Sequence, residues 1–91
     1  MDKIKVLIAD DHRVVREGLA AILKTKEDLH IVGEAQDGME AVEKAKALVP
    51  DVILMDVSMP RMGGVEATRQ IKREFPHIGI VALTMYEEQQ Y

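Results

Sequence analysis

Three carboxylates and one hydroxyl directly follow apolar runs of this sequence. They belong to Asp10, Asp11, Asp56 and Thr84. If the runs are parallel strands of one sheet, their carboxyl ends share an edge, and functional side chains gather there. Clustered carboxylates repel one another, so either some of them are protonated or a cation joins them. We therefore expect a metal-assisted site at this edge.

The types of ligand determine which chemistry such a site can perform. The chain contains no Cys, and His12, His30 and His77 are far apart in sequence. Oxygen ligands alone favour Mg²⁺ or a similar hard ion, which typically takes one or two carboxylates together with phosphate oxygens. One carboxylate is then free to attack a phosphoryl group, and Thr84 can hydrogen-bond a phosphoryl oxygen. The three His residues are expected to be surface or helix-cap residues.

Each of these side chains also has a simpler explanation on its own. An Asp between a strand and a helix is usually an N-cap, which is the ordinary role for Asp11. Asp56 alone fits a turn former, and Thr84 alone fits a cap or turn hydroxyl. Their combination at one edge favours the site over these separate roles.

Apolar patterning predicts the elements that would bring these residues together. Strands are predicted in apolar, β-branched runs at 4–9, 31–35, 52–55 and 79–83. Helices are predicted where apolar residues recur every three or four positions, over 13–24, 39–49 and 65–75, with a further helix beginning at 87–91. Strands alternating with helices indicate βα units and a doubly wound parallel sheet of the α/β class. The pair Gly63-Gly64 is expected to shape a turn before the third helix.

Composition excludes several classes of function. The chain has 91 residues, of which 47% are hydrophobic and 31% charged, which is typical of one globular domain. Its net charge of −4 argues against direct DNA binding by this segment. The absence of Cys excludes a disulfide scaffold and a thiolate zinc site. The apolar runs are too short to cross a membrane, so we expect a cytoplasmic protein with no membrane partner.

Three motifs identify a known family. They are VLIADDH at 6–12, DVILMDVSMPRMGG at 51–64 and VALTMY at 81–86. Together they resemble the receiver domain of bacterial two-component response regulators, over the whole chain. DDHRVVREGL and LTMYEE are similar to the subgroup that carries a C-terminal helix-turn-helix DNA-binding output domain. The resemblance implies a flavodoxin-like sheet, with four strands present in the order 2-1-3-4.

The resemblance also implies a role for each residue at the expected edge. Asp56 matches the aspartate that accepts a phosphoryl group. Asp10 and Asp11 match the acidic pair that organises Mg²⁺ or Mn²⁺, with Asp11 the more direct ligand. Asp56 and the backbone carbonyl of Ser58 match the remaining protein ligands of the metal.

A phosphorylation switch is the function that the resemblance implies. A sensor histidine kinase would supply the phosphoryl group, and Thr84 matches the switch hydroxyl that moves toward it. Ser58 and Tyr86 match the variable positions that tune the lifetime of the phospho-aspartate. Such a domain is a phospho-acceptor and not a turnover enzyme. It would contact DNA only through an output domain outside these 91 residues.

One departure from the family pattern affects whether this chain can be phosphorylated. Receivers normally continue through a fifth strand, which ends in a phosphate-binding Lys, and a fifth helix, and both are absent from these 91 residues. We therefore expect residues 1–91 to be a receiver domain that is incomplete at its C-terminus. Phosphorylation of Asp56 is predicted to be slow or undetectable, and uncovered apolar faces on strands 1 and 3 predict self-association. The alternative function is a phosphorylation-incompetent interaction or dimerisation domain of receiver fold.

Two other classes fit the sequence less well. Magnesium-dependent phosphohydrolases with an aspartyl nucleophile place nucleophile and acid two residues apart, whereas Asp10 and Asp11 are adjacent. A flavin- or nucleotide-binding domain needs a Ser-, Thr- or Gly-rich loop after the first strand, where two Asp residues would repel a phosphate.

Overall fold

Seven elements alternate along the chain in a computed structural model that describes residues 3–59 and 61–83. They are the strands β1 (Ile4–Ala9), β2 (Leu29–Ala35), β3 (Val52–Asp56) and β4 (Gly79–Leu83), and the helices α1 (Arg13–Leu23), α2 (Gly38–Leu48) and α3 (Gly64–Glu74). Each element predicted within the described residues is present, with ends that differ from the prediction by two residues at most. The helix predicted at 87–91 lies outside the described residues.

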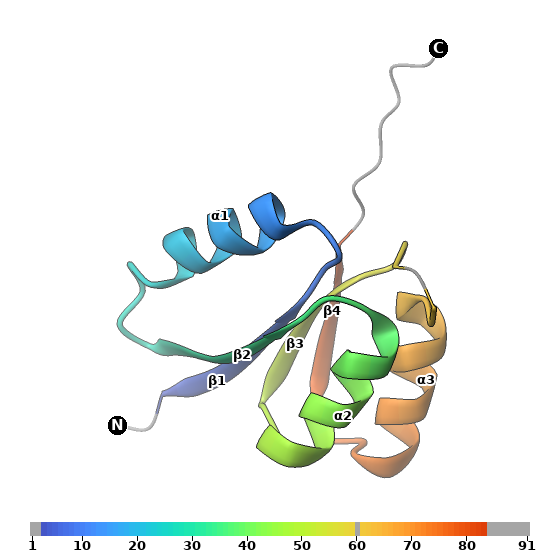
Figure 1. The fold of residues 1–91 in the computed structure, drawn as a ribbon. Helices are drawn as coiled ribbons and strands as arrows, with labels where there is room; N and C mark the ends of the chain where they lie inside the picture. The colour runs from blue at the N-terminus through green and yellow to red at the C-terminus, as the bar shows by residue number, and fades with distance from the viewer. Residues whose placement is uncertain (1–2, 60, 84–91) are drawn as a thin grey trace.

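The four strands form one parallel sheet. Their order is β2-β1-β3-β4, as predicted, so β1 and β3 lie at the centre and pair directly with each other. Helix α1 lies on one face of the sheet, and α2 and α3 lie together on the other face (Figure 1). Helices on both faces explain why the strands are apolar along most of their length. No helix of the described residues is long and apolar enough to cross a membrane.

The core lies between the sheet and the α2–α3 pair. Buried strand residues such as Leu7 and Ile53 pack there against small or branched helix residues such as Ala45, Ala67 and Ile71. Since Ala is small, the two helices can approach the sheet closely, which is typical of dense protein interiors. The α2–α3 face therefore supplies most of the apolar burial.

The α1 face is covered less completely. No residue of α1 is buried, and the side chains of Val14 and Ile22 are 79% and 60% exposed. On the sheet beneath, Val6 of β1 is buried, whereas Val81 of β4 is half exposed. The predicted uncovering of strand 1 is therefore wrong for its buried part from Val6 to Ala9, whereas Ile4 at its start is 43% exposed. On strand 3, Val52 and Leu54 are half-buried. Exposed apolar side chains also occur in α1 and in β4.

Candidate functional site

The acidic residues meet at the carboxyl edge of the two central strands. β1 ends at Ala9 opposite Met55 of β3, so the residues that follow these strands lie side by side. Ligand atoms of four residues, Asp10, Asp11, His12 and Asp56, all lie within 4.8 Å of one another. Three of these are the carboxylates singled out from the sequence. Thr84 and Tyr86, the other predicted site residues at this end, lie outside the described residues.

Two of the carboxylates are fully buried and only half satisfied. Asp10 Oδ1 accepts a hydrogen bond from the backbone N–H of His12 at 2.7 Å, and Asp56 Oδ1 accepts one from the backbone N–H of Ser58 at 3.0 Å. Among the described residues, neither Oδ2 atom has a hydrogen-bond partner. A buried polar atom without a partner is costly, and buried carboxylates are normally paired or bound to a metal. The two free oxygens therefore fit a cation.

Burial and like charge both act on Asp56. Burial raises the pKa of the Asp56 carboxyl, the Ser58 N–H opposes that rise, and the negative charges of Asp10 and Asp11 raise the pKa further. A divalent cation would remove most of this penalty, because it neutralises the charges that repel one another. The three carboxylates therefore fit Mg²⁺, an ion that prefers oxygen ligands.

Ser58 contributes to the site through its backbone N–H. Its N–H donates to Asp56 two residues earlier, which fixes the carboxylate at the end of β3. The part that the family resemblance gives to the Ser58 carbonyl, as a metal ligand, stays a prediction.

The loop after β3 returns tightly over the end of the strand. Gly63 is the N-cap of α3, and the N–H of Gly64 donates to the carbonyl of Val57 at 3.2 Å. A Cβ atom on Gly64 would lie 2.2 Å from the carbonyl oxygen of Asp56, which is too close for any side chain. Neither glycine has a positive φ. Glycine is thus needed at position 64 for space. The pair was predicted to precede the third helix, and this holds for Gly63, whereas Gly64 is already the first residue of α3.

The same loop is attached to the start of α2. Asp37, which is buried, caps α2 by accepting from the N–H of Glu40 at 2.8 Å, and it also forms an ion pair with Arg61 of the loop. Arg61 has a φ of 64°, an unusual conformation for a residue other than glycine. The sequence analysis did not identify this pair. Asp37 followed three residues later by Glu40 is a capping pattern that could have predicted the N-cap role of Asp37, but not its ion pair with Arg61.

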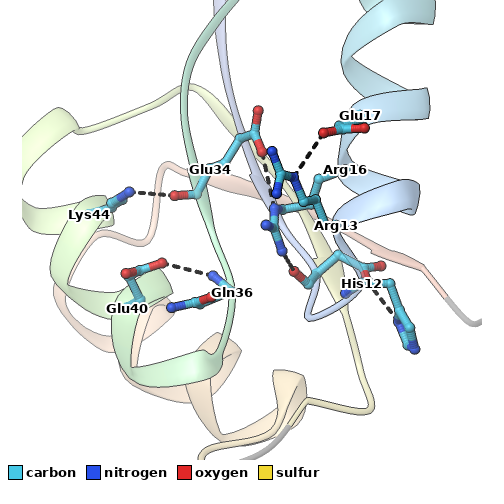
Figure 2. A network of polar contacts seen from close by, with 9 residues as sticks. His12, Arg13, Arg16, Glu17, Glu34, Gln36, Glu40 and Lys44 are labelled. Atoms are coloured by element: carbon cyan, nitrogen blue, oxygen red, sulfur yellow. Dashed lines mark hydrogen bonds and ion pairs between the residues drawn. The ribbon is translucent and has the colours of Figure 1, made fainter.

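An arginine of α1 supports the turn that carries Asp10. The guanidinium of Arg16 donates to the Asp10 carbonyl at 2.7 Å and to the Glu34 carboxylate of β2 at 3.0 Å. Figure 2 shows that Lys44 of α2 also reaches the Glu34 carbonyl. Arg16 is only 15% exposed, so it joins α1, the β1 turn and β2 from within the fold.

His12 is the fourth member of the cluster. It occupies the N-cap position of α1 and is 58% exposed, in accord with the surface or cap position predicted for it. Its ring does not cap the helix, however. Nδ1 lies 2.9 Å from Asp11 Oδ1 and 3.1 Å from Asp10 Oδ1. The hydrogen bond to Asp10 and the charge of Asp11 raise the pKa of His12.

An open parallel sheet with an acidic cluster at the carboxyl end of its two central strands defines a flavodoxin-like α/β domain with an acidic edge. Residues 6–91 match the response regulator receiver domain, so the chain belongs to that family. The phosphorylation switch is the role of this family, in agreement with the function that the sequence motifs implied.

Named relatives place the chain within two-component signalling. It is 52% identical over 85 residues to the response regulator protein VraR of Staphylococcus saprophyticus, covering 93% of this chain and 41% of that protein. The response regulator domain of Thermotoga maritima CheB superposes with a TM-score of 0.88 at 40% identity, covering 96% of this chain and 64% of that one. A chain of the CheX-CheY-BeF3-Mg+2 complex from Borrelia burgdorferi superposes with a TM-score of 0.88 at 27% identity, covering 98% of this chain and 67% of that one. The chain thus spans about two fifths of the length of its curated relative.

Proposed function

We propose that Asp56 is the phospho-acceptor of this receiver domain and that a sensor histidine kinase is the donor. The observation that carries the proposal is the fully buried Asp56 carboxylate, with one oxygen unpartnered among the described residues, beside Asp10 and Asp11. A buried carboxylate that faces like charges is suited to a reaction that brings in a cation and a phosphoryl group together.

The chemistry follows from the positions of these groups. An oxygen of Asp56 forms a bond to phosphorus while the bond from phosphorus to the kinase's histidine nitrogen breaks, and the electron pair of that bond returns to the nitrogen. Asp10, Asp11, Asp56 and the Ser58 carbonyl would hold Mg²⁺ or Mn²⁺. That ion supplies neutralisation of the phosphoryl oxygens. The N–H of Ser58 keeps Asp56 oriented throughout, since it already donates to the other carboxylate oxygen.

The finer assignments of the switch rest on the family resemblance. We propose Thr84 as the hydroxyl that binds the phosphoryl group, and Ser58 and Tyr86 as the residues that tune its lifetime. A DNA-binding output domain in the parent protein would be the target of the switch, in the cytoplasm. Self-association through β4, the last strand of the described sheet, also stays a prediction.

Phosphorylation by a small-molecule donor tests the acceptor directly. The chain is incubated with acetyl phosphate and Mg²⁺, and its intact mass is followed over hours. We expect a slow gain of one phosphoryl group. The gain should persist in the Asp28→Asn control, which alters an exposed carboxylate away from the cluster, and should disappear in Asp56→Asn and in EDTA.

The second candidate is the phosphorylation-incompetent interaction domain of receiver fold, in which Asp56 accepts no phosphoryl group. It predicts no mass gain at any time, although Mg²⁺ still raises the melting temperature of the chain. Mass gain that survives in Asp56→Asn would contradict both candidates as they are stated here.

A further inference from the structure

His12 brings a nitrogen donor into a cluster of oxygen donors. Its imidazole is held 2.9 Å from Asp11 Oδ1 and 3.1 Å from Asp10 Oδ1. The ring makes no side-chain hydrogen bond to the end of α1, although His12 is the N-cap residue. Helix capping therefore does not explain the orientation of the ring, and the two carboxylates do.

The same distances suit one coordination sphere. In an octahedral site with metal–ligand bonds of about 2.1 Å, adjacent ligand atoms are separated by about 3.0 Å, which is 2.1 Å multiplied by the square root of two. The His12 nitrogen stands at this separation from Oδ1 of Asp10 and from Oδ1 of Asp11. This nitrogen is hydrogen-bonded to Asp10, so an ion bound between the carboxylates would take the place of the shared proton, and the imidazole would lie within its reach.

A second observation, the burial of oxygen atoms without a hydrogen-bond partner, also indicates a ligand at this place. The Oδ2 atoms of Asp10 and Asp56 belong to side chains with no solvent exposure, and neither has a partner among residues 3–59 and 61–83. Arg16 binds the Asp10 carbonyl and not its carboxylate, so it leaves this oxygen free. The orphaned oxygens and the His12 nitrogen together make a mixed O and N ligand set.

We propose that His12 is a direct metal ligand that shifts this site toward transition ions such as Co²⁺ and Ni²⁺, relative to Mg²⁺. Imidazole is a good ligand for these ions, whereas Mg²⁺ prefers carboxylate, carbonyl and water oxygens. Loss of the imidazole should therefore weaken Co²⁺ and Ni²⁺ binding and leave Mg²⁺ binding nearly unchanged. The inference deepens the proposed function, since it uses the same three carboxylates.

The test compares metal affinities of the whole chain by calorimetry at one fixed pH, with Mg²⁺ and Co²⁺ as the probes. His12→Asn is the informative variant, because Asn is a preferred N-cap residue and should preserve the start of α1. We expect its Co²⁺ affinity to fall by about tenfold or more, the scale of losses at metal sites, and its Mg²⁺ affinity to change by less than about threefold. The exposed imidazole of His30 provides the matched control, and His30→Ala should keep both affinities.

The visible absorption of bound Co²⁺ gives a second readout, because the spectrum depends on whether nitrogen or oxygen is bound. The spectrum should differ between the wild type and His12→Asn and be the same in His30→Ala. Equal Co²⁺ affinities and equal spectra in the wild type and His12→Asn would overturn the role of His12 while leaving the Mg²⁺ site intact. Failure of the wild type to bind Mg²⁺ at all would count against the proposed function instead.

Discussion

At the scale of single residues, the site is an arrangement of mutually repelling charges that the fold holds close together. The three carboxylates were found from sequence because each follows an apolar run, and the ends of parallel strands meet. The contact of His12 with the carboxylates and the ion pair of Arg61 were missed for a physical reason. Their contacts depend on a ring orientation and on a backbone with φ of 64°, neither of which an apolar pattern encodes.

Removing one charge should stabilise the metal-free protein. In Asp56→Asn the amide oxygen can still accept from Ser58, while the buried negative charge is lost. In EDTA at neutral pH we expect the free energy of unfolding to rise by about 1–2 kcal/mol, measured by urea titration. Added Mg²⁺ should then stabilise the wild type more than the variant. A less stable variant in EDTA would contradict the electrostatic account of the site.

The pH dependence of the same comparison has a definite sign. Because the pKa of Asp56 is raised in the folded state, the folded protein binds more protons than the unfolded chain above the ordinary carboxyl pKa of about 3.9. The wild type therefore loses stability as the pH rises through the raised pKa. Asp56→Asn lacks this contribution, so the difference between the two proteins in EDTA should grow with rising pH and vanish near pH 3.

At the scale of elements, the sequence predicted which segments are helices and strands, and the ends were set by local contacts. Helix α2 begins one residue before the predicted start because Asp37 caps it, and α3 does so because Gly63 and Gly64 fit under the end of β3. A periodic pattern marks the apolar face of a helix, whereas a cap is a hydrogen bond and a close approach is a matter of space.

Two glycines in helices should respond oppositely to the same substitution. Gly64→Ala places a methyl group 2.2 Å from the Asp56 carbonyl oxygen, so β3 and α3 must separate, and we expect a loss of about 1–3 kcal/mol in unfolding free energy. Gly18 of α1 has nothing within 4 Å of its Cβ position, so Gly18→Ala should gain about 0.5–1 kcal/mol from helix propensity. Urea titration measures both. Equal effects would show that the return of the loop over β3 is not tight.

At the scale of the whole molecule, the two layers of helices differ in how deeply they bury their side chains against the sheet. Helices α2 and α3 bury small and branched side chains against β1 and β3, whereas α1 buries none of its residues. The sequence did not predict this difference, because the apolar spacing of α1 is as regular as that of the other helices. How deeply a helical face is buried depends on what else covers the sheet, which is a tertiary property.

Hydrogen exchange should reveal the difference in burial between α1 and the α2–α3 pair. Amides in α1 are expected to exchange faster than those in α2 and α3, and the central strands should be the most protected. The measurement is made by NMR or by mass spectrometry in EDTA. Similar protection in the three helices would mean that Arg16 and the half-buried residues of α1 hold this layer as firmly as a buried core does.

Because Arg16 attaches α1 to the sheet, ion binding at the acidic edge depends on whether this helix is docked. Asp11 and His12 lie in the turn that enters α1, and Arg16 ties that helix to the Asp10 carbonyl and to Glu34. Detachment of the helix would therefore move Asp11 and His12 away from Asp10 and Asp56 while the sheet stays folded. Apparent affinity at this edge is the intrinsic affinity scaled by the fraction of molecules with α1 docked. An ion seated there would in turn hold the helix in place, so that occupancy and docking of this layer reinforce each other.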